Sequence, residues 1–80
     1  MRTKAKLHAH TRQRAEERYD GLKINHDEMR TLMQQIRDGS AVFLKRYSHT
    51  RTEWLVILRD TRLRVIYDNN HKAIRTVLPV

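Results

Sequence analysis

The chain has 80 residues and carries 17 Lys and Arg against 9 Asp and Glu, so its formal net charge is +8 with the five histidines neutral. A chain of this length forms one small domain and buries only roughly 60% of its unfolded surface, which excludes a large internal cofactor cavity. The absence of cysteine excludes disulfides, thiolate nucleophiles and cysteine-ligated metals, and we expect no cofactor and no metal site.

The first half of the sequence predicts two helices. Residues 3–19 contain neither Gly nor Pro and few β-branched side chains, which favours a helix. We expect residues 1–5, at its start, to be frayed because a polar terminus has little to pack against. The second helix is expected over about residues 26–38, because Asn25 followed by Glu28 is the pattern of a capping box and a glycine directly follows the helix.

From residue 41 onward the apolar residues alternate with a period of two, and β-branched and aromatic residues predominate. This pattern predicts four antiparallel strands, over about residues 41–47, 53–59, 63–68 and 72–78. The expected fold class is therefore α+β in the order ααββββ, a single domain over residues 1–80 with two N-terminal helices packed on one face of a four-stranded antiparallel sheet.

Strand alternation divides the side chains of the sheet into two faces. The face expected under the helices is mainly apolar and carries Trp54, Val56, Leu58, Leu63, Val65, Tyr67, Ile74, Thr76 and Leu78. The opposite face is mixed and carries Leu55, Ile57, Arg59, Arg64, Ile66, Arg75 and Val77. Because its composition is mixed, this face is a candidate surface for a partner.

The first helix has cations where an apolar stripe is expected. At about 100° per residue, His10, Arg14 and Arg18 lie within roughly 60° of Leu7, and we call these three residues the ridge. An amphipathic helix normally places Leu or Ile at such positions, and breaks of pattern of this kind often mark function. The alternative is that the helix docks in a slightly rotated position through Leu7, Ala15, Tyr19 and Leu22, while its arginines extend into water.

Tyr67 and Thr76, the polar members of the apolar face, are expected to point toward the helices, where they can meet the ridge. A histidine, two guanidinium groups, a phenol and a hydroxyl suit metal-independent cleavage of RNA, in which the ribose 2′-hydroxyl attacks its own 3′ phosphate. Histidine exchanges protons near neutral pH, and arginines bind phosphate oxygens. We therefore predict a catalytic site of His10, Arg14, Arg18, Tyr67 and Thr76.

The excess positive charge falls in two blocks, residues 1–18 and residues 45–64, each with six Lys or Arg against two acidic residues. Such patches bind polyanions because each neutralised phosphate releases a condensed counterion. We predict that Lys45, Arg46 and Arg64 contact nucleic acid, with RNA preferred. The alternative is an ordinary solvated basic surface.

Several segments together resemble a known superfamily. They are His-Thr-Arg-Gln-Arg-Ala-Glu-Glu-Arg at residues 10–18, the capped second helix, Val-Ile-Tyr-Asp at 65–68 and Ile-Arg-Thr-Val-Leu-Pro at 74–79. Over residues 10–79 the combination resembles small domains of the RelE, BrnT and colicin D type, which include ribonuclease toxins. The resemblance implies a metal-free RNase cleft that contains the ridge and Thr76, and it adds a cognate antitoxin to the expected partners.

The predicted function is RNA binding with toxin-like, metal-independent endoribonuclease activity. The alternative is a non-catalytic phage or mobile-element regulator that binds and inhibits a host protein through the mixed face around Leu55, Ile57 and Arg59. No apolar run approaches the roughly 20 residues of a membrane span, and the first ten residues lack the apolar core of a signal peptide. We therefore expect a cytoplasmic protein without membrane contact.

Overall fold

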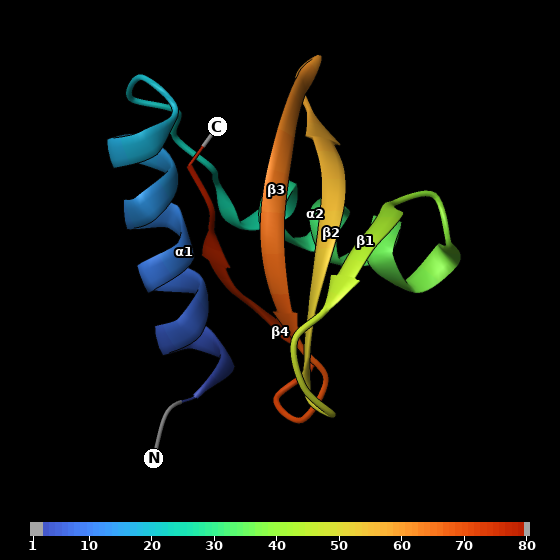
Figure 1. Ribbon diagram of the computed structural model, residues 1–80. Helices are drawn as coiled ribbons and strands as arrows, with labels where there is room; N and C mark the ends of the chain where they lie inside the picture. The colour runs from blue at the N-terminus through green and yellow to red at the C-terminus, as the bar shows by residue number, and fades with distance from the viewer. Residues whose placement is uncertain (1–2, 80) are drawn as a thin grey trace.

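The computed structural model describes residues 3–79 and contains two helices followed by a four-stranded antiparallel sheet (Figure 1). The strands lie in the order β1-β2-β3-β4 across the sheet. The bounds of the elements are α1 Lys4–Arg18, α2 His26–Asp38, β1 Val42–Arg46, β2 Arg51–Leu58, β3 Thr61–Asp68 and β4 Ala73–Val77.

Helix α2 begins and ends at the capping residues that the sequence predicts. Asn25 caps the helix, and its side chain and that of Glu28 exchange hydrogen bonds with each other's backbone N–H groups, which confirms the capping box. Gly39 ends the helix with a φ of 84°, which glycine adopts without strain. The predicted fraying is not seen at residues 3–5, because Thr3 caps α1 and Lys4 begins it; residues 1–2 lie outside the described residues.

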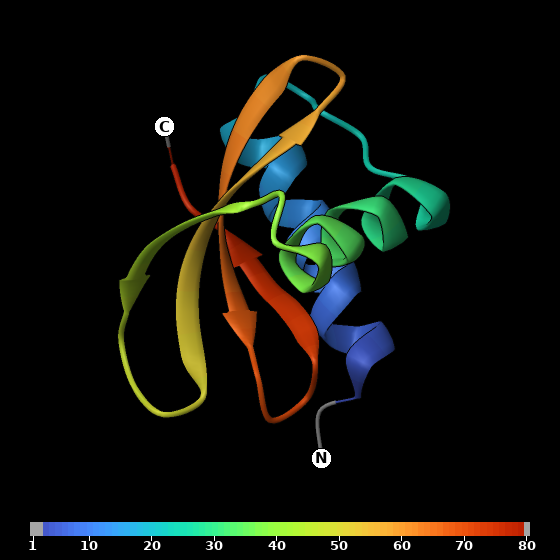
Figure 2. The ribbon, with the colours of Figure 1, turned by 90° about the vertical axis from the view of Figure 1, so that its right-hand side faces the viewer.

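The predicted packing of both helices on one face of the sheet is wrong. Helix α2 lies on one face and contributes four buried apolar side chains to the core, Met29, Leu32, Met33 and Ile36. Helix α1 lies along β4, the edge strand, and Figure 2 shows that the other face of the sheet has no helix over it. The physical reason is that the outer edge of β4 needs hydrogen-bond partners, and α1 supplies them.

The clearest of these contacts surround Ile74 in β4. Its N–H donates to Nε2 of His8 at 3.2 Å, and its carbonyl accepts from the hydroxyl of Thr11 at 2.8 Å. Thr11 is fully buried, and its hydroxyl also lies 2.9 Å from the carbonyl of Leu7, one turn earlier in α1. Two polar side chains of one helix thus occupy both backbone groups of one edge residue, where a fifth strand would otherwise pair.

Further along β4 the same helix continues to supply donors. Nη1 of Arg18 donates to the carbonyl of Val77 at 2.7 Å, and the hydroxyl of Tyr19 donates to the carbonyl of Leu78 at 2.7 Å. Arg18 and Tyr19 are therefore docking residues of α1, which otherwise buries only Leu7, Thr11 and Ala15. The alternative docking of α1 expected from the sequence correctly included Leu7, Ala15, Tyr19 and Leu22, which are buried or pack against the core, but it did not include Thr11.

Helix α2 supplies hydrogen-bond partners to the backbone of β2 where β2 extends past β1. The side-chain amide of Gln35 accepts from the N–H of Ile57 at 2.9 Å and donates to its carbonyl at 2.8 Å. The last residue of β2 that pairs with β1 is Leu55. Gln35 therefore replaces the neighbouring strand at the end of β2.

A β-bulge in β4 changes which side chains face the core. Thr76 pairs with Ile66 and Ile74 pairs with Tyr67, so Arg75 is an extra residue without a partner in β3. Ile74 and Val77 are buried in the core, whereas Thr76 lies beside Ile66 on the opposite face. The predictions that Thr76 and Leu78 belong to the helix-covered face and that Val77 belongs to the mixed face are therefore wrong, because simple alternation does not hold across a bulge.

We expect Thr11→Val to reduce the free energy of unfolding by about 1–3 kcal/mol, because it keeps the side-chain shape but leaves the buried carbonyl of Ile74 without its donor. The matched control is Thr31→Val in α2, where the exposed hydroxyl bonds only to the carbonyl of Asp27 in its own helix. The control should change stability by less than about 0.5 kcal/mol. Urea denaturation followed by circular dichroism measures both, and equal effects would contradict the role assigned to Thr11.

Candidate nucleic-acid interface on the open sheet face

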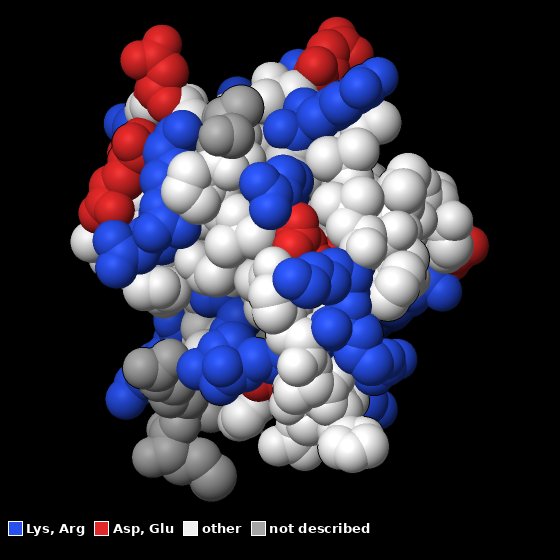
Figure 3. All heavy atoms as spheres, viewed as in Figure 1, with Lys and Arg blue, Asp and Glu red and all other residues white. Residues whose placement is uncertain are grey.

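The face of the sheet that α2 does not cover is called here the open face. Cross-strand pairing places its residues: Lys45 lies opposite Glu53, Glu53 opposite Ile66, and Ile66 opposite Thr76. The open face carries Val42, Lys45, Tyr47, Arg51, Glu53, Leu55, Ile57, Arg62, Arg64, Ile66, Asp68, Arg75, Thr76 and Leu78. Figure 3, which looks onto this face, shows Lys and Arg over much of it, small acidic areas at its middle and below, and a largely uncharged area on the right.

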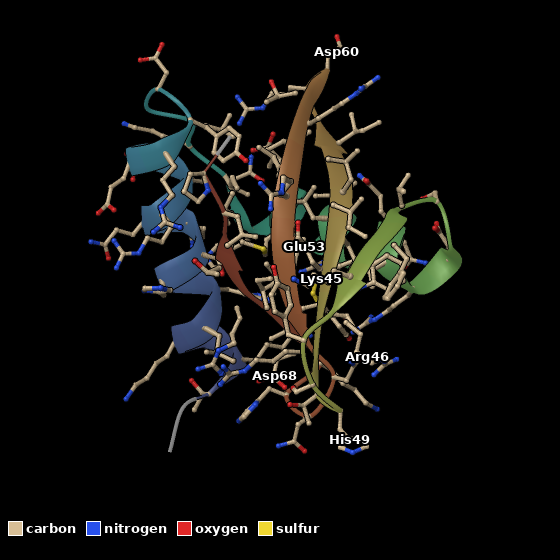
Figure 4. The ribbon with its side chains drawn as sticks, viewed as in Figure 1. Lys45, Arg46, His49, Glu53, Asp60 and Asp68 are labelled. Atoms are coloured by element: carbon tan, nitrogen blue, oxygen red, sulfur yellow. The ribbon has the colours of Figure 1, made fainter. Side chains whose placement is uncertain are left out.

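Glu53 lies near the centre of the open face, close to Lys45 (Figure 4), and is only 4% exposed. Its carboxylate accepts hydrogen bonds from the Tyr47 hydroxyl at 2.6 Å and from Nε of Arg64 at 2.8 Å. Burial by itself raises the pKa of Glu53, but these two hydrogen bonds and the charge of Arg64 outweigh it, and the pKa lies below its ordinary value. Glu53 is therefore a buried, ionised anchor for the side chains above it.

Asp68, at the end of β3, is a second buried anchor and is 3% exposed. It accepts from the backbone N–H groups of Asn70 and His71, from Nδ1 of His71 at 3.0 Å and from Nη1 of Arg75 at 3.2 Å. Burial raises its pKa, but the hydrogen bonds from His71 and Asn70 outweigh burial, and the net shift is downward. Both carboxylates of the open face thus lie beneath basic side chains, and the positive charges face the solvent.

Between these two anchors lies a depression of about 280 Å³. Its apolar surface comes from Ile66 and Leu78, and Tyr47, half-exposed, stands at its border. Arg51 and Arg75 bring two guanidinium groups to the same depression. Apolar surface with an aromatic ring and cations beside it is the combination that holds an unstacked base and its phosphate.

The ridge residues His10 and Arg14 lie at the border of the open face. The buried stripe of α1 runs through Leu7, Thr11 and Ala15, and the flank that faces α2 is the one with His8 and Arg12. At 100° per residue His10 and Arg14 fall on the other flank, toward the open face. Both are half-buried, and Nη1 of Arg14 forms an ion pair with Glu17 at 2.7 Å.

The remaining members of the predicted catalytic set are separated. Arg18 is bonded to the carbonyl of Val77. Tyr67 is 6% exposed and belongs to the hydrophobic core under α2, whereas Thr76 lies on the open face. The structure therefore brings His10, Arg14 and Thr76 to the same side of the sheet and leaves Tyr67 on the other.

The three residues predicted to contact nucleic acid are all exposed. Nζ of Lys45 lies 4.9 Å from the ring centre of Tyr47, and Arg64 is held by Glu53. Arg46 points to the loop after β1, where its guanidinium approaches the carbonyls of Ser48 and His49 (Figure 4). Lys45 and Arg64 thus belong to the open face, whereas Arg46 pairs with Thr52, on the other side of the sheet.

Arg51, which lines the depression, and Glu53 and Asp68, which anchor the face, were not predicted from the sequence, whereas Arg75 was expected on the mixed face. Alternation along β2 was a usable signal for Arg51, because it is two residues from Glu53. Alternation placed Arg75 on the mixed face, and the structure has it there, although as the bulge residue it has no partner in β3. The burial of the two carboxylates depends on cross-strand neighbours that only the assembled sheet reveals.

No protein-family model, curated protein or solved structure matches this chain. Among residues 3–79 no group of three or more histidine or acidic side chains is placed to hold a metal ion. Neither α1 nor α2, the helices in that part of the chain, combines the length and apolar composition of a membrane-spanning helix.

The lowered pKa of Glu53 has a consequence for stability. The carboxylate contributes stability that is fully present above its unfolded pKa of 4.5 and is lost as the pH falls through the lower pKa of the folded state. We expect Glu53→Gln to reduce the free energy of unfolding by about 1–2 kcal/mol at pH 7, because hydrogen bonds to a charged group are lost. The difference from wild type should shrink progressively below pH 4.5.

Chemical denaturation at several pH values measures this difference. Glu16→Gln, at an exposed position of α1, is the control and should stay within about 0.5 kcal/mol of wild type throughout. A difference for Glu53→Gln that is the same at every pH would show that its ionisation does not stabilise the fold.

Proposed function

We propose that this protein binds single-stranded RNA through the open face of its sheet. One observation carries the proposal: the acidic side chains of that face, Glu53 and Asp68, are buried and hydrogen-bonded, while its basic side chains reach the solvent. A phosphate backbone on this surface therefore meets cations without meeting exposed carboxylates. Each phosphate neutralised in this way releases counterions, which provides most of the affinity.

The shape of the open face favours a single strand. Tyr47 offers an exposed ring, and the apolar side chains of Ile66 and Leu78 line the depression next to it. Sheet surfaces with aromatic and apolar side chains bind splayed bases by stacking, and neighbouring arginines bind the phosphates. Arg51 and Arg75, which line the depression, would bind the phosphates.

We expect Arg51→Ala to weaken binding of a 5′-hydroxyl RNA oligonucleotide and to reduce the slope of log K against log salt by about 0.7, the value for one phosphate contact on a single strand. Arg51 makes no side-chain hydrogen bond or ion pair with another residue in the range 3–79, so its removal should leave the fold intact. Fluorescence anisotropy between about 50 and 200 mM salt measures the slope.

The matched control is Lys23→Ala, which removes one charge beside Arg12 on the α2 side of the molecule. It should leave the salt slope within error of wild type. Equal losses in the two variants would indicate non-specific attraction to a +8 protein, and no binding at about 50 mM salt would contradict RNA binding altogether.

Metal-independent cleavage of the bound RNA is the second part of the proposal. It is supported by the place of His10 and Arg14 on the flank of α1 that borders the open face. The imidazole would take the proton of the ribose 2′-hydroxyl as its oxygen bonds to phosphorus, and would return a proton to the departing 5′-oxygen as that bond breaks. Arg14 would stabilise the additional negative charge on the phosphate.

We expect His10→Ala to lower cleavage of total RNA in excess EDTA by at least about 10²-fold, the usual size of a general acid–base contribution. The products should carry 2′,3′-cyclic phosphate ends. His49→Ala, which removes a loop histidine between β1 and β2, should cleave like wild type. Equal cleavage by His10→Ala and wild type would contradict the assignment, and binding without any cleavage would leave RNA binding as the function.

The alternative function is a regulator that binds and inhibits a host protein. Exposed apolar side chains on β1 and at the end of β2 favour it: Val42, Phe43, Leu44 and Ile57 are each between 43% and 55% exposed. Capture from a lysate treated with nuclease distinguishes the two functions. A stoichiometric protein partner that Ile57→Ser releases would favour the regulator, whereas loss of all partners on nuclease treatment favours RNA binding.

A further inference from the structure

A second basic site lies on the opposite side of α1 from the ridge, in the groove between α1 and α2. We call it the interhelical groove, and its volume is about 240 Å³. Four cationic side chains line it, Lys4 and Arg12 from α1 and Arg30 and Arg37 from α2, and no Asp or Glu does. Its apolar lining comes from Met29 and Met33, which are buried in the core.

The cations of the interhelical groove have no carboxylate partner, unlike half of the other arginines in residues 3–79. Within residues 3–79, none of Lys4, Arg12, Arg30 and Arg37 makes an ion pair or a side-chain hydrogen bond. By contrast, four arginines elsewhere each hold a carboxylate at 3.2 Å or less: Arg14, Arg59, Arg64 and Arg75. Like charges gathered without a counter-charge repel one another, and an anion bound among them would relieve that repulsion.

His8 shows the electrostatic effect of this arrangement. It lines the groove, and its Nε2 accepts the N–H of Ile74, which leaves Nδ1 to carry the proton of the neutral ring. Burial, followed by the charges of Lys4 and Arg12, lowers the pKa of His8 to about 4. At neutral pH the histidine is therefore an uncharged donor among four fixed positive charges.

The dimensions of the groove define the class of ligand. Pockets that enclose drug-sized molecules measure roughly 300–1,000 Å³, so the groove suits a smaller group. One guanidinium group can donate two parallel hydrogen bonds to two oxygens of a phosphate, and three of the four cations are arginines. A terminal phosphate monoester carries roughly −1.5 to −2 charges at pH 7, so about two phosphate groups balance the four cations.

We propose that the interhelical groove binds a terminal phosphate or a short polyphosphate group. Two sources supply this chemistry: a free polyphosphate or nucleotide, and the phosphorylated 5′ end of an RNA chain. The inference does not depend on RNA binding by the open face, because the groove lies on the other flank of α1 and shares no lining residue with the depression.

Titration with inorganic tripolyphosphate tests the proposal, by calorimetry and by amide and methyl chemical shifts at about 100 mM salt. Binding should move the signals of His8 and Met33, and Arg12→Gln/Arg30→Gln should weaken it at least about 10-fold. The control Lys6→Gln/Lys72→Gln removes the same charge from positions that do not line the groove, and it should bind like wild type. Equal weakening in both variants, or no saturable binding, would overturn the proposal.

A second experiment distinguishes a free nucleotide or polyphosphate from the phosphorylated 5′ end of an RNA chain. Short oligonucleotides with a 5′-triphosphate, a 5′-monophosphate or a 5′-hydroxyl are compared with adenosine triphosphate in wild type and in Arg12→Gln/Arg30→Gln. A 5′-phosphate that strengthens binding only when the groove is intact identifies an RNA end. Equal affinity for the free nucleotide and the triphosphate oligonucleotide identifies a free ligand. Loss of 5′-hydroxyl RNA binding through Arg51→Ala, with tripolyphosphate binding retained, would show that the two sites are separate.

Discussion

The rest of the structure depends on the hydrogen bonds that α1 makes to the outer edge of β4. Ile74 is bonded through both its N–H and its carbonyl, to His8 and Thr11. An exposed strand edge attracts other strands, and a buried one without partners is costly. By meeting this need with side chains, α1 takes the position of a fifth strand and adds a helix wall beside the sheet.

Both candidate sites follow from that position. Because α1 occupies the edge of the sheet, it does not cover the second face, and the open face stays accessible with its buried anchors Glu53 and Asp68. Because α1 also stands beside α2, its other flank forms the interhelical groove with Arg12. One helix therefore borders two basic surfaces, with its buried stripe between them.

Features set by neighbours in the sequence were predictable, and features set by distant neighbours were not. The capping box at Asn25 is local, and its prediction is confirmed. The docking of α1 was predictable in its apolar contacts but not in its polar ones, because Thr11 and Arg18 face backbone carbonyls, and a sequence does not show which carbonyls lack donors. The position of Thr76 escaped prediction because the bulge at Arg75 inverts the alternation. The basic character of the open face followed from charge counting, whereas its two carboxylates became buried only through cross-strand contacts.

A helix covers one edge of the sheet and not the other, and this difference limits how copies of the protein can assemble. The β4 edge is closed by α1, whereas β1, the other edge strand, carries exposed apolar side chains such as Phe43 and Leu44. A sheet that can be extended at one edge only can pair with one other such edge, and the pair then has closed edges at both ends. Edge-to-edge addition therefore terminates at two copies, so the covered edge protects the protein from growing into fibres.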